Sequence, residues 1–246
     1  MKTYTVLGKT ALALLLAHFS HGVAFATIYN AADDFSSTSN PTGVWSYGWS
    51  PTLGGAFNVD TDSTQALGGI SGLVQWRGDQ PAQADGNPSV FKNTTASPIV
   101  FSSITLPAGA LALHPGSAGQ DAVIQFTAPS AGQYSISAIF TGQDSEGPTS
   151  TDVHVYVGTT SVFDNLVNGF VPNSTASLVP SLFNLSQGET VDFIVGNGGN
   201  GFNNDATGLQ ADITAVPEST TMIAGLLLLL PFGAGLLRTV STRREK

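Results

Sequence analysis

Hydrophobic and polar residues alternate in short runs along the middle of the chain, and this two-residue period predicts β-strands. The clearest run is 152–157, in which Val153, Val155 and Val157 share one face. The same alternation recurs in three further runs, 133–140, 190–195 and 209–214. No stretch of twelve residues carries the stripe of an amphipathic helix.

Turn signals separate these runs at short intervals. Pro129-Ser-Ala-Gly132 and Gly158-Thr-Thr-Ser161 each lie between two apolar runs, and a Pro-Ala-Gly turn lies between the expected strands 104–106 and 110–114. Short strands with frequent turns are typical of an all-β fold, which we expect to be an antiparallel two-sheet sandwich of jelly-roll type.

Residues 121–214 contain an ordered series of patterns. An apolar strand, Pro-Ser-Ala-Gly, a Val-x-Val-x-Val strand, Ser-Gln-Gly-Glu-Thr-Val-Asp-Phe, a Gly/Asn loop and a final strand follow one another. This order resembles the sandwiches of carbohydrate-binding modules. The resemblance implies a fold rather than a function, since sandwiches carry many functions.

The first 26 residues predict a secretory signal peptide that signal peptidase removes. Lys2 and Lys9 precede an apolar stretch at 11–17, and Ala24-Phe25-Ala26 is a small-x-small cleavage site. A retained N-terminal anchor is the alternative, but the apolar stretch is short. We therefore expect an exported domain over residues 27–215.

The last 31 residues, 216–246, combine three features. A Val-Pro-Glu-Ser-Thr motif occupies 216–220, an apolar segment 221–238, and a basic end 238–246. The sixteen uncharged residues 222–237 cover roughly 24 Å as a helix, which approaches the roughly 30 Å hydrocarbon core of a membrane. The basic end predicts a cytoplasmic C-terminus. The alternative, a buried helix of a soluble domain, is disfavoured because five consecutive leucines leave no polar face.

This tail resembles the PEP-CTERM sorting signal of Gram-negative bacteria. Val216, Pro217 and Glu218 match the motif, and Ser219 stands where the family usually has a second proline. The resemblance implies a membrane-anchored surface protein whose tail is recognised and processed by exosortase, a membrane transpeptidase. It also implies a link to exopolysaccharide and biofilm, with a final location at the cell surface or outside the cell.

Charge is distributed very unevenly along the sequence. Between residues 27 and 216 only Arg77 and Lys92 are basic, against fifteen acidic residues, which gives a net charge of −13. Such a domain repels phosphate backbones, so nucleic-acid binding is not expected. The absence of cysteine excludes disulfides and thiol chemistry.

Trp45, Tyr47 and Trp49 lie two residues apart, so in a strand all three project from one face. Aromatic rings on an exposed face could stack on the sugar rings of a glycan. The alternative is that the three rings fill the core. The small polar residues between them fit a solvent face, which favours the core.

Two acidic or amide-rich stretches offer oxygen ligands for calcium. The first contains Asp60 and Asp62, and the second, the loop 196–205, contains Asn203 and Asp205. Neither completes an EF-hand. Turn formation explains both stretches equally well, because Asn, Asp and Gly favour turns. We therefore expect no cofactor, and a structural Ca²⁺ in one of the two stretches is the alternative.

Catalytic motifs are scarce in the exported part. His114 and His154 are its two histidines, and no Gly-x-Ser-x-Gly nucleophile motif occurs. The acidic pair Asp144 and Glu146 lies in an expected loop, whereas glycosidases need two rigidly held carboxylates. We therefore expect a non-catalytic exported surface or matrix protein associated with polysaccharide. A carbohydrate-binding module, with or without calcium, is the alternative, and a secreted hydrolase is the least favoured.

Overall fold

The computed structural model describes residues 26–78, 86–147, 149–170 and 174–217. The expected signal peptide, Glu218 of the sorting motif and the apolar segment 221–238 lie outside these ranges. Within them, no helix is long and apolar enough to cross a membrane. One compact unit runs from Thr27 to Ala215.

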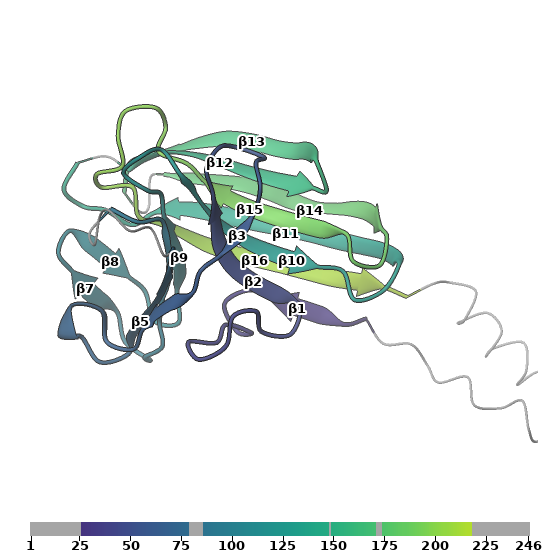
Figure 1. Ribbon diagram of the computed structural model, residues 1–246, viewed down its shortest axis with the longest axis horizontal. Helices are drawn as coiled ribbons and strands as arrows, with labels where there is room; N and C mark the ends of the chain where they lie inside the picture. The colour runs from purple at the N-terminus through teal and green to yellow at the C-terminus, as the bar shows by residue number, and fades with distance from the viewer. Residues whose placement is uncertain (1–25, 79–85, 148, 171–173, 218–246) are drawn as a thin grey trace, which may run out of the picture. The chain divides into compact units, whose positions relative to one another are not determined.

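This unit is built from β-strands arranged in two main sheets (Figure 1). The eight-stranded sheet contains, in spatial order, β14 (Thr175–Leu185), β11 (Gly132–Gly142), β16 (Thr207–Val216), β9 (Leu111–His114), β6 (Ser89–Asn93), β5 (Leu73–Arg77) and β4 (Asp62–Thr64), with β1 (Ile28–Asn30) also paired to β16. The six-stranded sheet contains β13 (Thr160–Asn168), β12 (Ser150–Val157), β15 (Thr190–Val195), β10 (Asp121–Thr127), β2 (Trp45–Ser50) and β3 (Asn58–Val59). All pairings in the six-stranded sheet are antiparallel, which confirms the expected all-β antiparallel architecture.

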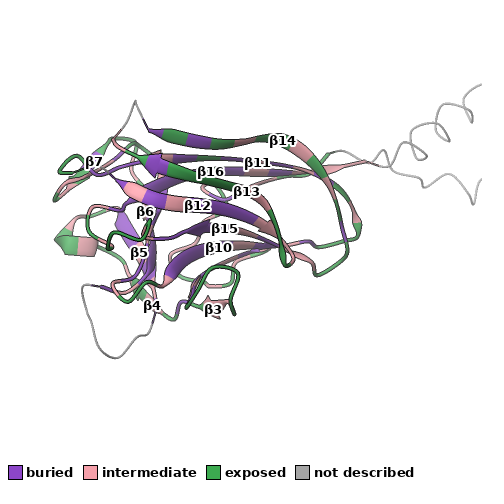
Figure 2. Cartoon of the chain, turned by 90° about the horizontal axis from the view of Figure 1, so that it is seen from above, coloured by how far each residue is buried: buried purple, intermediate pink, exposed green. Residues whose placement is uncertain are grey.

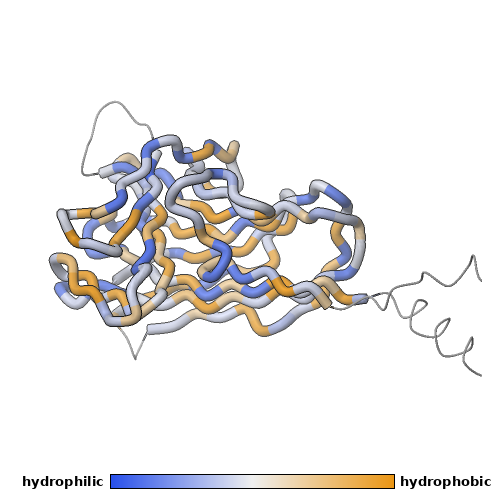
Figure 3. The backbone as a smooth tube through the Cα atoms, turned by 90° about the horizontal axis from the view of Figure 1, so that it is seen from below, coloured by the Kyte–Doolittle hydropathy of each residue, from blue (hydrophilic) through white to orange (hydrophobic). Residues whose placement is uncertain are grey.

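The main core fills the space between the two sheets. Alternate residues of each strand point into it, as the sequence pattern predicts: Val153 and Val155 from β12 and Ile136 and Phe140 from β11 are fully buried. Figure 2 shows the same strands with buried residues along β10, β15 and β12, and Figure 3 shows hydrophobic positions recurring along the strands.

A second, smaller core lies on the outer face of the eight-stranded sheet. A short hairpin of β7 (Ile99–Phe101) and β8 (Ile104–Leu106), together with the 3-10 turn η1 (Leu67–Gly69), covers β5, β6 and β9 there. Its buried members are Leu73, Phe91, Ile99, Leu106, Ala112 and Ala206. The strands β5 and β6 are consequently buried on both faces, which explains why their sequences do not alternate.

Strand pairing around the Pro-Ala-Gly turn differs from the simplest expectation. The two strands that flank this turn, β8 and β9, are not partners: β8 pairs with β7, whereas β9 pairs with β6 and β16. The turn therefore carries the chain from the hairpin back into the eight-stranded sheet.

Candidate functional site

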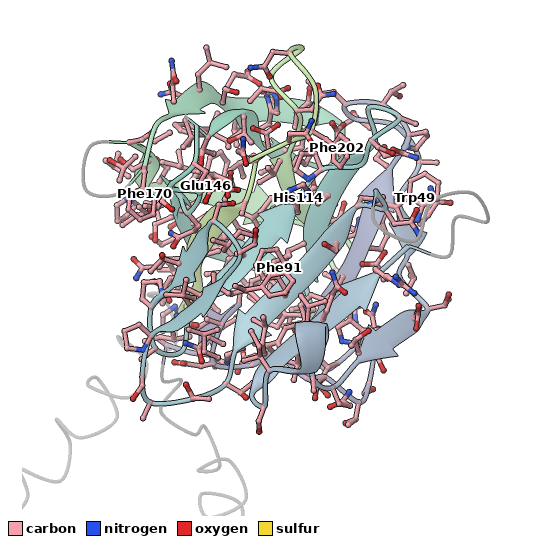
Figure 4. All side chains as sticks on the ribbon, turned by 90° about the vertical axis from the view of Figure 1, so that its left-hand side faces the viewer. Trp49, Phe91, His114, Glu146, Phe170 and Phe202 are labelled. Atoms are coloured by element: carbon pink, nitrogen blue, oxygen red, sulfur yellow. The ribbon has the colours of Figure 1, made fainter. Side chains whose placement is uncertain are left out.

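The three aromatic residues of β2 lie in different surroundings: Trp45 and Tyr47 are in the core, whereas Trp49 is at the edge of the sandwich. Trp45 and Tyr47 have no exposed surface, so neither ring has a face free to stack on a glycan. Stacking by these two residues is therefore excluded, and they occupy the core because their strand face points at the opposite sheet. Trp49 is half-buried at the end of β2, beside Gly78, whose added Cβ would lie 2.9 Å from the indole Nε1 (Figure 4).

A cavity of about 420 Å³ lies between the β7–β8 hairpin and the outer face of β5, β6 and β9, and we call it the hairpin cavity. Its size is within the range of small-molecule sites. Figure 4 views this end of the sandwich, with Phe91 and His114 near its centre. The lining residues are Leu67, Gln75, Arg77, Asn87, Ser89, Phe91, Phe101, Ser102, Ile104 and His114.

Two phenylalanines form the aromatic part of the hairpin cavity, and Leu67 and Ile104 complete its apolar lining. Phe91, on β6, is 3% exposed and belongs to the smaller core. Phe101, on the hairpin, rests against η1, where Gly68 adopts a positive φ of 61°. A Cβ on Gly68 would lie 2.3 Å from Phe101 Cε2, so only glycine allows this close contact. The hairpin ring is thus held in place by the turn beneath it.

Arg77 and Asn87 supply much of the polar lining. Arg77 lies directly opposite Asp62 in the β4–β5 pair. Its Nε and Nη2 donate to one oxygen of that carboxylate, Asp62 Oδ2, at 2.7 and 2.6 Å. Asn87 Nδ2 donates to the carbonyl oxygen of Gly78 at 2.8 Å, which fixes the orientation of the amide. The positive charge in the lining is therefore already paired with a carboxylate.

His114 contributes a neutral imidazole to the lining. Its Nδ1 lies 2.9 Å from the carbonyl oxygen of Pro115. A carbonyl only accepts, so Nδ1 carries the hydrogen. Burial lowers the pKa of His114, and the ring is neutral at pH 7 with Nε2 as an acceptor. Phe202 packs edge-on against the ring at a centroid distance of 6.0 Å.

The tip of the hairpin is anchored by a buried carboxylate. Ser102, which lines the cavity, has a positive φ of 54°, an unusual conformation for a residue other than glycine. The next residue, Ser103, donates its hydroxyl to Asp144 Oδ1. Asp144 is 1% exposed, and its Oδ2 accepts the backbone N–H of Ala206 at 3.1 Å. The carboxylate therefore ties the hairpin to the segment before β16.

Another cavity, of about 510 Å³, lies over β11, β16 and β9. Its described lining residues include Asp33 and Asp212 but no aromatic residue, lysine or arginine. These residues offer neither a stacking surface nor a counter-ion for an acidic ligand. The hairpin cavity, which combines rings with donors and acceptors, is the better candidate site.

The four residues considered as calcium ligands are not gathered into one site. Asp62 is paired with Arg77, and Asn203 is exposed while Asp205 is fully buried. Asp60 is 1% exposed, and neither of its carboxylate oxygens has a hydrogen-bond partner among the described residues. Burial raises the pKa of Asp60 to about 8 and that of Asp205 to about 6. Over the described ranges, no group of three or more His, Cys, Asp or Glu side chains could hold a metal.

His154 is held between two carboxylates. Its Nε2 lies 3.0 Å from Asp152 Oδ2, and its Nδ1 lies 2.6 Å from Asp164 Oδ1. Asp152 and His154 are two residues apart on β12 and therefore share one strand face. Both imidazole nitrogens are occupied, so neither is left to activate a serine hydroxyl. This arrangement does not form a hydrolase triad.

No protein-family model matches the sequence, and no curated protein matches it either. Among solved structures, the chain is similar to a family 51 carbohydrate-binding module from Clostridium perfringens in complex with methyl-galactose (11% identity, 76% of this chain, 99% of that chain, TM-score 0.36). It is also similar to a family 35 carbohydrate-binding module from Clostridium thermocellum (15%, 47%, 83%, TM-score 0.29). A third is an adhesin domain of Lys-gingipain from Porphyromonas gingivalis (12%, 78%, 99%, TM-score 0.32). TM-scores this low carry no argument about this chain.

Proposed function

We propose that the protein is a non-catalytic, exported protein whose β-sandwich binds a saccharide in the hairpin cavity. The observation that carries this proposal is the composition of the lining, which places the half-buried Phe101 ring among amide, hydroxyl and imidazole groups. A sugar presents the complementary surface, with apolar C–H faces and a rim of hydroxyls.

The polar groups of the lining suit hydroxyls better than a charged or wholly apolar ligand. Each sugar hydroxyl donates one hydrogen bond and accepts others, so its partners must include both kinds of group. Gln75 provides a donor and an acceptor, and the neutral His114 provides an acceptor. The half-buried Phe101 ring is the aromatic surface for an apolar face of the ligand, whereas Phe91 is 3% exposed and forms the base of the cavity.

The same lining supports a binding role rather than hydrolysis. Glycoside hydrolysis in most families uses two carboxylic acids that flank the scissile bond. Among the described residues that line the hairpin cavity there is no aspartate or glutamate. The cavity thus holds a sugar without the groups that would cleave it.

The two ends of the chain support export and sorting. In this proposal signal peptidase removes residues 1–26, and the apolar segment 221–238 holds the protein in the membrane until an exosortase-type transpeptidase processes the tail. The domain would then act at the cell surface or in the extracellular matrix. There it would bind exopolysaccharide.

Binding of the full chain, purified from a Gram-negative expression host, to a glycan array tests the proposal. Gln75→Ala removes a hydrogen-bonding amide and should weaken binding about fivefold, and Phe101→Ala should weaken it about tenfold. Val100→Ala is the matched control, because Val100 neighbours Phe101 but is 66% exposed and does not line the cavity. Repeating the array with a chelator separates calcium-dependent from calcium-independent binding. If no glycan binds, the proposal fails.

A further inference from the structure

We propose that a second cavity of the domain binds a protonated primary amine. It is the cavity of about 510 Å³ over β11, β16 and β9, and we call it the sheet cavity. Its floor is the outer face of these strands, and its walls are the turn 107–110 and the segment 30–33. The inference goes beyond the proposed function, because the sheet cavity and the hairpin cavity share no described lining residue.

Gln143, directly after β11, brings an unpaired acceptor to the sheet cavity. The side chain is 4% exposed. Its Nε2 lies 3.3 Å from the carbonyl oxygen of Thr141, and because a carbonyl only accepts, this contact fixes which end of the amide is the nitrogen. The buried Oε1 has no hydrogen-bond partner among the described residues. A buried acceptor without a donor costs free energy, which a ligand that donates to it recovers.

The neighbouring strand leaves space for this amide. Gly208, on β16, also lines the cavity, and a Cβ at this position would lie 2.7 Å from Gln143 Nε2. A larger residue at position 208 would therefore displace the amide. The glycine allows the acceptor to stay where a ligand on the sheet meets it.

Two carboxylates, those of Asp33 and Asp212, add negative charge to the lining. Asn30 positions both residues. Its Nδ2 donates to Asp212 Oδ1 at 2.7 Å, and its Oδ1 accepts the backbone N–H of Asp33 at 2.8 Å. Among the described lining residues there is no lysine, arginine or histidine. The lining thus combines acceptors with negative charge, which suits a ligand that is both a donor and a cation.

The domain has few cations of its own to occupy this place. Between residues 27 and 217 the only lysine and arginine are Lys92 and Arg77. Arg77 lines the hairpin cavity and pairs with Asp62. Lys92 Nζ donates to the carbonyl oxygen of Ala32 and lies 5.8 Å from the centre of the Phe35 ring. The net charge of −13 between residues 27 and 216 further attracts cations from solution.

A primary ammonium group has the chemistry that this lining requires. It carries three N–H donors, one positive charge and no acceptor, so it can donate to Gln143 Oε1 while a carboxylate balances its charge. Ile139, Leu209 and Pro107 add aliphatic surface for the body of the ligand. The volume is within the range of small-molecule sites. Amino sugars and alkyl diamines both combine an ammonium with such a body.

Calorimetry on the full chain at fixed ionic strength tests the proposal. The probes are methyl glucosaminide, its neutral N-acetyl derivative and 1,4-diaminobutane. At least one of the two amines should bind, and the N-acetyl derivative should bind at least about fivefold more weakly than the tighter amine. Binding of either amine supports the proposal, and the tighter one identifies the body that the cavity prefers. If neither amine binds, or if the neutral derivative binds as tightly, the proposal is overturned.

Two variants test the lining itself. Gln143→Met removes the acceptor at nearly constant size and should weaken amine binding about fivefold. Asp212→Asn removes one charge but keeps an oxygen for Asn30, and should weaken binding about tenfold. Melting curves establish that both variants fold. Gln143→Met should do so, because it removes a buried oxygen that has no partner among the described residues.

Glu189→Gln is the matched control for charge. Glu189 lies beside Ala128, before the start of β11, whereas the sheet cavity lies at the end of that strand. Its substitution should leave amine binding within about twofold. Equal weakening by Glu189→Gln and Asp212→Asn would show a general attraction to an acidic domain and overturn the site. Amine binding that is lost in Phe101→Ala, or that persists unchanged in Gln143→Met, would also overturn it.

Discussion

His154 illustrates how the surroundings of one side chain decide its protonation. Burial lowers its pKa, but the hydrogen bonds and charges of Asp152 and Asp164 outweigh burial, and the net effect raises the pKa of His154. The hydrogen bond from His154 in turn lowers the pKa of Asp152. The three groups therefore favour a protonated imidazole between two carboxylates, which joins β12 to β13.

The sign of the resulting pH dependence follows from linkage. A raised histidine pKa stabilises the folded protein fully below the unfolded value of 6.5, and this contribution is lost as the pH rises through the folded value. Replacing the imidazole in His154→Gln should therefore cost on the order of 1 kcal/mol at pH 5.5 and less at pH 8.5. Urea unfolding at the two pH values measures this difference.

A double-mutant cycle provides the control for His154. In an Asp164→Asn background the histidine loses one of its two carboxylates, so the pH dependence of the His154→Gln effect should shrink. An effect of equal size at both pH values would contradict a charged imidazole.

Asp60 shows the opposite case, a buried carboxylate without a hydrogen-bond partner among the described residues. Its pKa of about 8 means that the folded chain keeps a proton which the unfolded chain loses near pH 4. Stability therefore falls as the pH rises between these values. Asp60→Asn cannot ionise and should be more stable than the wild type at pH 8, by about 1–3 kcal/mol, but nearly equal to it at pH 4. Chemical denaturation at both pH values tests this.

Calcium provides a direct check on the same residue. If Asp60 binds a cation, calcium will raise the melting temperature of the wild type but not that of Asp60→Asn, and the variant will be the less stable protein at pH 8. Either result would contradict a neutral Asp60 carboxyl. Either would also support the calcium site that the sequence offers as an alternative.

The burial and protonation of a single polar side chain are the properties that the sequence predicts least well. The spacing of Trp45 and Tyr47 correctly places both rings on one face, and the small polar residues between them correctly favour the core for these two rings. Asp60, in contrast, reads as a turn residue, because its burial comes from segments distant in the sequence. Its protonation has no local signature in the sequence.

At the scale of elements, the β7–β8 hairpin decides where the candidate site lies. The turn η1 packs against Phe101 of the hairpin, and Asp144 binds Ser103 at its tip. The buried residues of the hairpin belong to the smaller core. These contacts join segments that are far apart in the chain. Ser103 and Asp144, for example, are 41 residues apart.

Two neighbouring glycines in η1 allow the contact with the hairpin to be tested separately from backbone strain. Gly68 and Gly69 both have positive φ, 61° and 77°. Only at Gly68 would a Cβ meet Phe101, whereas at Gly69 nothing lies within 4 Å. Gly68→Ala should therefore weaken saccharide binding about tenfold more than Gly69→Ala, and hydrogen exchange should increase in the hairpin. Equal effects of the two substitutions would contradict the proposed role of Phe101.

Strands with one buried face were predictable from their alternation, whereas β5 and β6, which are buried on both faces, carry no such pattern. The alternation in 133–140, 152–157, 190–195 and 209–214 matches β11, β12, β15 and β16. The candidate site escaped prediction because Phe91 and His114 lie in short runs without alternation. A cluster of aromatic and polar residues on β5, β6 and β9 becomes visible only after those strands are paired. Most of β14 was also not predicted, since Pro180 interrupts its pattern.

At the scale of the whole molecule, the expected export and sorting signals predict where the processed protein begins and ends. The two ends carry six of the eight basic residues. In a host with an exosortase, intact-mass analysis should find a species that begins at Thr27 and ends between Val216 and Ser219. In a host without the enzyme, the chain should extend to Lys246. Chains ending only at Lys246 in both hosts would identify the tail as a permanent anchor.

Because the two hydrophobic cores are separate, the hairpin can evolve without disturbing the packing between the sheets. The main core holds the two sheets together, whereas residues 99–106 depend on the smaller core and on Asp144. Substitutions at the hairpin tip can therefore reshape the cavity while the inter-sheet packing stays as it is. Such a scaffold can acquire new ligands by exchanging eight residues, and grafting alternative hairpins between Ile99 and Leu106 offers a practical route to altered specificity.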